Sequence, residues 1–199
     1  MDLPNFGLET KPYLIYEAKK GTFKHVVDKQ KNPISLGEFI ADLENYATGW
    51  GNMAEGQAPQ WAMNKNRAVF GPIPSDAKDK DGKPAWKQGI RVSLFSPATF
   101  GGDGLCDFDT TGFGARTGIF DLLKKFVSHP DFKPGMVPVC KFTGYVDHGT
   151  GSKATTIPQF DIVKFIARPA ALSGAAPAQQ QAVVHQAAPT PVAKTANEF

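Results

Sequence analysis

The chain has 199 residues, 41% of them hydrophobic, which is enough to form one medium-sized domain with a substantial core. Its net charge of +3 is compatible with a polyanionic partner but is far from the balance of a histone-like protein. Cys106 and Cys140 lie far apart without a CxxC pair, and this indicates neither a zinc site nor a disulfide framework. The N-terminus lacks the pattern of a secretion signal, and no run approaches the roughly 18 apolar residues of a membrane span. We therefore expect a soluble, cytoplasmic protein.

The first segment, "PYLIYEAKKGTFKHVV", has β-rich runs on either side of Lys20-Gly21 and predicts a hairpin. The next, "SLGEFIADLENYATGWGNM", is ambiguous over residues 36–46: a Ser35-x-x-Glu38 capping box and the apolar spacing favour a helix, whereas alternating residues favour a strand. The stretch "GPIPSDAKDKDGKPAWKQG" has the prolines and alternating charge of an exposed loop.

The second half of the chain gives clearer patterns. "KQGIRVSLFSPATF" places Ile90, Val92 and Leu94 on one face of a predicted strand and more polar residues on the other. "TGIFDLLKKFVSHP" predicts a helix that begins near Thr117 and ends before Pro130. Its apolar stripe is Ile119, Leu122, Leu123, Phe126 and Val127. Two β-rich runs, "MVPVCKFTGYV" and "IPQFDIVKFIARP", flank the polar turn "DHGTGSKATT" and predict a second hairpin.

The composition changes sharply after Pro169. Residues 170–199 are mostly Ala, Gln and Pro and cannot bury enough surface to offset the entropy of ordering, so we predict a body over residues 1–169 and a disordered tail over 170–199. The tail ends in "KTANEF". Glu198, Phe199 and the terminal carboxylate together offer a compact anion and one ring, which suits a small apolar pocket with a basic rim on a partner protein.

With residues 36–46 taken as a strand, the order of elements resembles that of the OB-fold, a five-stranded Greek-key barrel with one helix between strands three and four. An OB-fold body followed by a disordered linker and an acidic tip ending in phenylalanine is similar in plan to single-stranded DNA-binding proteins of bacteria, phages and plasmids. The resemblance implies a protein of the bacterial host cytoplasm. It also implies that the protein acts in DNA replication or recombination and recruits other replication or recombination proteins through Glu198 and Phe199.

Sequence-tolerant binding of a single strand requires cations for the phosphates and flat rings on which the bases stack. The chain interleaves both residue types. Trp86 is the leading candidate ring, because it lies in a polar loop beside Lys87. The predicted nucleic-acid-binding residues are Phe23, Lys24, Trp50, Trp61, Trp86, Lys87, Arg91, Phe95, Lys141, Tyr145 and Lys153.

Enzymatic signals are weak. Asp103, Asp107 and Asp109 lie in a glycine-rich stretch and could hold magnesium or calcium, but their spacing does not match an EF-hand and no distant residue completes a nuclease site. Cys140 is predicted to be a core residue, and Cys106 to be more exposed without a histidine beside it. We expect no catalytic residue, metal or cofactor.

Three function classes stay open at this stage. The leading one is a single-stranded DNA-binding protein, with RNA binding and self-association undecided. The second is a structural or adaptor protein, such as a virion component, and the third is a metal-dependent enzyme at the aspartate-rich loop. Steeply salt-dependent binding to oligonucleotides separates the first class from the second.

Overall fold

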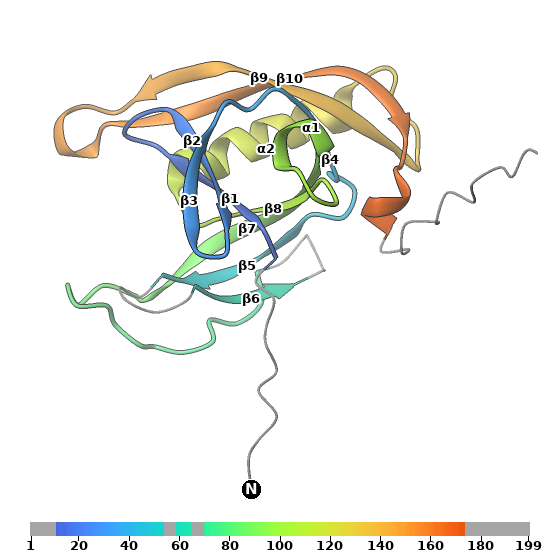
Figure 1. Cartoon of the computed structure of the whole chain (residues 1–199). Coiled ribbons are helices and arrows are strands. Elements are labelled where there is room, and N and C mark those ends of the chain that lie inside the picture. The colour runs from blue at the N-terminus through green and yellow to red at the C-terminus, as the bar shows by residue number, and fades with distance from the viewer. Residues whose placement is uncertain (1–10, 54–58, 65–69, 174–199) are drawn as a thin grey trace, which may run out of the picture.

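The computed structural model describes residues 11–53, 59–64 and 70–173, apart from the side chain of Lys153. These residues form ten strands in one mixed sheet, together with a few short helical segments and one long helix (Figure 1). The mainly β class predicted from the sequence is confirmed. The sequence predicted five strands, and the described residues contain twice that number.

The N-terminal strands are β1 (Tyr13–Glu17), β2 (Thr22–Val27) and β3 (Gln30–Ile34). β1 and β2 form the predicted hairpin, and Gly21 adopts the positive φ of 64° that the turn requires. β3 was not predicted. It follows a two-residue turn in which Asp28 and Lys29 have φ values of 49° and 66°. Turns of this conformation usually contain Asn-Gly, and because this one has no glycine, the sequence gave no sign of a hairpin here.

The ambiguous segment is not helical. It contains β4 (Glu38–Ala41), and it is followed by β5 (Ala47–Asn52) and β6 (Gln60–Asn64). β4 pairs with β7 and β9, and this pairing buries Phe39 and Ala41 on one side of the strand. The helical interpretation of this segment is wrong, because pairing with neighbouring strands outweighs the local preference for a helix.

The centre of the sheet is β7 (Trp86–Phe95), followed by the short α1 (Pro97–Phe100) and β8 (Leu105–Thr110). Ile90, Val92 and Leu94 are fully buried, which confirms the predicted alternation. β8 pairs with β7 in antiparallel fashion and with β1 in parallel. This parallel pairing connects the N-terminal hairpin to the centre of the sheet.

The long helix α2 (Phe113–Ser128) begins earlier than the predicted Thr117. Its apolar stripe packs into the core as predicted, except that Val127 is 68% exposed. The N-cap residue is Gly112, which has no side chain to cap the helix, so the sequence offered no capping side chain to mark this end.

The last strands, β9 (Met136–His148) and β10 (Thr155–Ala167), form the predicted hairpin and are joined through the 3-10 turn η1 (Gly151–Lys153). The hairpin runs over α2 (Figure 1). The sheet order is β10-β9-β4-β7-β8-β1-β2-β3, yet the backbone N–H of Thr156 in β10 donates to the carbonyl of Ala18, just after β1, at 2.9 Å. The sheet therefore curls until β1, the sixth strand in this order, meets β10, the first.

The described chain ends with the 3-10 turn η2 (Ala170–Ser173), which lies against β7. The turn η2 lies just beyond the boundary at Pro169 that the sequence suggested. Glu198 and Phe199 lie outside the described residues. Within the described ranges, no helix combines the length and apolar character needed to cross a membrane.

Candidate nucleic-acid interface

A cleft of about 740 Å³ lies on the outward face of the sheet, between the N-terminal strands and β5–β8. One row of register partners crosses five strands beneath it, in the order Lys31 (β3), Val26 (β2), Tyr13 (β1), Asp107 (β8) and Ser93 (β7). Side chains that share a row and a face lie next to one another. The lining residues are Lys11, Tyr13, Ile15, Tyr16, Lys31, Met53, Pro59, Trp61, Arg91, Asp107, Asp109, Thr110 and Thr111.

Trp61 is the largest ring in this cleft. It extends from β6 across two glycines of neighbouring strands: a Cβ placed on Gly51 would lie 2.5 Å from the indole Cζ3, and one on Gly89 would lie 2.8 Å from it. Because any larger residue at these positions would displace the ring, the glycines explain how an indole lies close against the sheet. The part of Trp61 that stays exposed faces the cleft.

Arg91 enters the cleft from β7, paired with Asp109 directly opposite on β8. Nε and Nη2 of Arg91 donate to the two carboxylate oxygens, each at 2.6 Å. The hydrogen bonds that Arg91 donates to Asp109 raise the pKa of the guanidinium, so Arg91 stays charged. Burial raises the pKa of Asp109, against the opposing effect of Arg91. The pair fixes the orientation of the guanidinium plane.

The remaining charges of the cleft are a second pair and a free lysine. Asp107 accepts from Lys11 Nζ at 2.9 Å and from Ser93 Oγ at 2.7 Å. Lys31 is exposed and has no acidic partner within the described residues. With Lys11, Lys31 and Arg91 against Asp107 and Asp109, the lining carries three cations and two carboxylates, a net charge of +1.

The structure corrects the prediction for Phe23. This ring is 2% exposed and packs against Tyr16 and Phe142 at centroid distances of 4.9 and 5.1 Å. It is a core residue and has no face on which a base could stack. Neighbouring residues of a strand point to opposite sides, so Lys24 is outward while Phe23 is inward. Lys24 is half-buried and its Nζ lies 2.6 Å from Glu17.

Trp50 anchors a loop. Its Nε1 donates to the carbonyl of Gly71 at 2.8 Å, and its ring meets Phe70 edge-on at 6.0 Å. Because both of these contacts are within the protein, Trp50 holds the chain after residue 70 against β5. It does not line the cleft.

Trp86, Lys87 and Phe95 lie along β7 but outside the cleft. Trp86 is half-buried at the start of the strand and not in the polar loop, while Lys87 is exposed and lies 3.9 Å from Asp79. Phe95 is half-buried at the far end. The structure brings Trp61 and Arg91 together and leaves these three residues apart from them.

The predicted residues of the last hairpin lie elsewhere. Lys141 is exposed on β9. Tyr145 is 49% exposed, and its ring covers the turn at Gly21. Lys153 lies in η1 and its side chain is outside the described set. This hairpin is therefore a separate surface from the cleft.

The aspartate-rich segment is held by protein donors. Asp103 accepts from the backbone N–H of Leu105, in addition to the pairs already made by Asp107 and Asp109. Among the described residues, no group of three or more His, Cys, Asp or Glu side chains is arranged to hold a metal ion. Cys140 is buried as predicted, but Cys106 is buried too, contrary to expectation, because it points inward from β8. Burial raises the pKa of both thiols to about 12.

Sequence reasoning missed Lys11, Tyr13, Lys31 and Met53 as cleft residues. Tyr13 alternates outward in a predicted strand, which is a usable signal, but its neighbours in space depend on the parallel pairing of β1 with β8. Lys31 belongs to β3, which was not predicted as a strand.

Comparison of the chain with protein-family models, with curated proteins and with solved structures found no match. A functional proposal for this protein therefore rests on the geometry and charge of its surfaces.

Proposed function

We propose that this protein binds single-stranded DNA without sequence preference, in DNA replication or recombination. The observation that carries the proposal is the cleft in which Trp61 and Tyr13 lie with Arg91 and Lys31. Base stacking on aromatic side chains contributes about 1 to 3 kcal/mol per base and tolerates any sequence. Cations beside the rings provide the contacts to the phosphates.

The charge of the cleft favours single strands over duplexes in this proposal. Three cations opposed by two carboxylates leave only a small net charge, so phosphate attraction alone supplies little affinity. Rings add affinity only where bases are unpaired and can leave their own stack. A duplex offers its phosphates but not its base faces, and we expect it to bind more weakly.

The OB-fold plan is part of the same proposal. The segments β4–β5, β7, β8, β9 and β10 follow one another in the order of the five OB strands, with α2 between the third and the fourth. On this interpretation β1, β2, β3 and β6 are additions, and the cleft lies over strands equivalent to those that bind oligonucleotides in OB-folds. We also propose that replication or recombination proteins bind to Glu198 and Phe199 at the end of the tail.

The test is a fluorescence anisotropy titration of a labelled oligothymidine at two salt concentrations, with duplex DNA of equal length for comparison. Lys31→Glu reverses an exposed cleft cation that has no acidic partner among the described residues, and Lys164→Glu makes the same charge change at an exposed position of β10. We expect tight binding to the single strand that weakens modestly as the salt concentration rises, and that is reduced much more by the first variant than by the second. No binding at low salt, or equal effects of the two variants, would refute the cleft as the DNA site.

A further inference from the structure

The indole of Trp61 and the guanidinium of Arg91 are neighbours on the outward face of β7. A Cβ placed on Gly89 would lie 2.8 Å from Cζ3 of Trp61, so the ring reaches β7 at Gly89. Arg91 is two residues further along the strand and points to the same face. Two residues of a strand span about 7 Å, so the edge of the indole lies beside the arginine side chain.

The guanidinium of Arg91 has a second donor edge that stays free. A guanidinium carries five N–H donors in one plane, and Asp109 accepts one from Nε and one from Nη2, each at 2.6 Å. The other edge, formed by Nη1 and the second N–H of Nη2, has no acceptor among the described residues. The side chain is 36% exposed, so a ligand in the cleft can reach this edge. Because Asp109 fixes the guanidinium plane, the free edge is a rigid fork of two parallel donors.

The charges around this fork favour a neutral acceptor over a phosphate. The carboxylate of Asp109 balances the charge of Arg91, and the nearby pair of Lys11 with Asp107 is also balanced. An anion beside Arg91 is therefore attracted by the guanidinium and repelled by Asp109. Lys31, which is exposed and has no acidic partner in the described part of the chain, is the better place for a phosphate.

Guanine is the base that matches a fork of two donors. Its N7 and O6 are neighbouring acceptors, whereas adenine has a donor beside its N7, and the polar group of a pyrimidine on the corresponding edge is a single acceptor in thymine and a donor in cytosine. A base stacked on Trp61 can turn this edge towards Arg91, because the two side chains are neighbours in the cleft.

We propose that the cleft favours a guanine at one position of the bound single strand, with its ring on Trp61 and its N7 and O6 accepting from Arg91. This inference rests on the proposed function and adds one preference to it. Stacking and phosphate contacts hold the other nucleotides, so binding tolerates other sequences. In a strand without guanine, Arg91 acts only as a cation beside the ring. Asp109 is a positioning residue, because it acts through Arg91.

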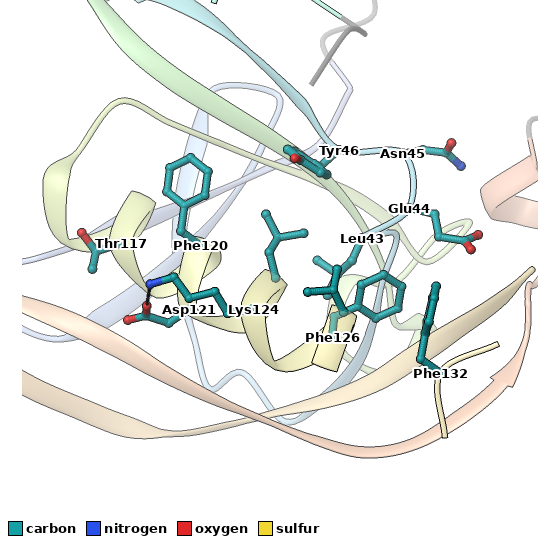
Figure 2. Close-up of a pocket in the computed structure, with 12 residues that line it drawn as sticks. Leu43, Glu44, Asn45, Tyr46, Thr117, Phe120, Asp121, Lys124, Phe126 and Phe132 are labelled. Atoms are coloured by element: carbon teal, nitrogen blue, oxygen red, sulfur yellow. Dashed lines mark hydrogen bonds and ion pairs between the residues drawn. The ribbon is translucent and has the colours of Figure 1, made fainter. Parts of the chain in front are cut away.

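A groove of about 1030 Å³ along α2 offers no comparable site (Figure 2). It shares no lining residue with the cleft. Lys124 is the one cation of its lining and pairs with Asp121 at 3.0 Å. With Glu44, two carboxylates oppose this one cation, and the resulting net charge of −1 disfavours a nucleic acid. The ring and the fork therefore occur together in the cleft and not in this groove.

The experiment is a set of anisotropy titrations with short oligothymidines whose central base is guanine, adenine or thymine. Guanine and adenine are both purines, so their comparison removes most of the difference in stacking. We expect the strand with guanine to bind at least about fivefold more tightly than the strand with adenine. This ratio should be the same at low and at high salt, because a contact to a base releases no counterions.

Base analogues and a pair of variants identify the contact. Hypoxanthine keeps N7 and O6 and should retain the gain, whereas 7-deazaguanine lacks N7 and should lose most of it. Arg91→Lys keeps the charge but removes the fork, and we expect it to abolish the preference for guanine over adenine. Arg116→Lys makes the same change on α2 outside the cleft, where Nη1 donates to the carbonyl of Gln88, and should preserve the preference. Circular dichroism melts confirm that both variants fold.

The outcomes separate this inference from the proposed function. Equal binding of the guanine and adenine strands, full binding of the 7-deazaguanine strand, or a preference that survives in folded Arg91→Lys would overturn the guanine site and leave DNA binding intact. A ratio that falls as salt rises would also overturn it, because the effect would then come from a phosphate contact. If no oligonucleotide bound at all, the proposed function itself would fail, and this inference with it.

Discussion

Arg91 and Asp109 face each other across β7 and β8 and share two hydrogen bonds of 2.6 Å. Nε and Nη2 of the guanidinium are thereby occupied, while Nη1 has no acceptor among the described residues. The arginine is rigid and charged, and one of its nitrogens stays available to a ligand in the cleft.

Replacing the acid should strengthen DNA binding. Asp109→Asn removes a negative charge beside Arg91, so we expect tighter binding to oligothymidine and a logarithmic salt slope steeper by about 0.7. The loss of the ion pair should lower the free energy of unfolding by about 1 to 3 kcal/mol. Titrations at several salt concentrations and urea unfolding measure the two effects. Weaker binding by a folded variant would argue against a phosphate near Arg91.

Removal of the cleft indole should weaken binding. We expect Trp61→Ala to lose about tenfold or more in affinity for oligothymidine, because stacking on that ring is lost. Trp86→Ala is the matched control, since Trp86 lies on β7 outside the cleft. Anisotropy titrations compare the two variants. If Trp86→Ala were the more damaging change, the binding surface would lie at the start of β7.

The stability of the protein should fall in mild acid because of His25. This residue is 7% exposed, its Nε2 has no partner in the described part of the chain, and burial lowers its pKa. Since the unfolded chain, with an ordinary pKa near 6.5, binds the proton more readily, stability is lost as pH falls below about 6.5 towards the lower pKa of the folded state.

The measurement is the melting temperature at pH 7.5 and at pH 5.5, for the wild type and for His25→Phe. The ring of Phe100 lies 5.4 Å away, so an aromatic replacement suits the site. We expect the variant to lose less stability between the two pH values than the wild type. Equal losses would assign the acid sensitivity to other groups.

Gly118 should not tolerate a side chain. A Cβ on this residue would lie 2.5 Å from the carbonyl oxygen of Pro158 in β10, so Gly118→Ala must push the helix away from the strand. We expect a loss of about 1 to 3 kcal/mol in urea unfolding, despite the better helix propensity of alanine. Gly37→Ala serves as the control, because a Cβ there meets nothing within 4 Å.

Both thiols should be inert in the folded protein. Cys106 and Cys140 are buried with pKa values of about 12, so almost no thiolate is present at pH 8. We expect reaction with a disulfide reagent only after denaturant is added. Rapid labelling of one thiol in buffer would show that its strand opens readily.

Strands and helices with a clear hydrophobic periodicity in their own residues could be predicted from the sequence. β7 alternates Ile90, Val92 and Leu94 with more polar neighbours, and its burial follows that alternation. The helix α2 was placed by its apolar stripe, but its start was missed, because the residues there include Gly114, which α2 needs to approach the carbonyl of Thr156. Contacts between elements, and not local preference, determine such positions.

The cleft itself was only partly predictable. Trp61 and Arg91 were chosen from the sequence as a ring and a cation, and both line it. Tyr13 joins them only because β1 runs parallel to β8, and no local pattern indicates a parallel pairing between segments so distant in the chain. Phe23 was misassigned for a simpler reason: its neighbour Lys24 is outward, and consecutive residues of a strand face opposite sides.

The contact between Ala18 and Thr156 also bears on how the protein is made. These residues are 138 positions apart, and both the backbone and the side chain of Thr156 donate to the Ala18 carbonyl. During translation the early strands leave the ribosome long before β10 exists, so the sheet stays open until nearly all of the described body has been synthesised. Pairings of such sequence separation also slow folding, because the loop entropy is lost before the contact forms. The growing chain therefore exposes unpaired strand edges for most of its synthesis, and these edges are the surfaces on which it could aggregate before β10 is made.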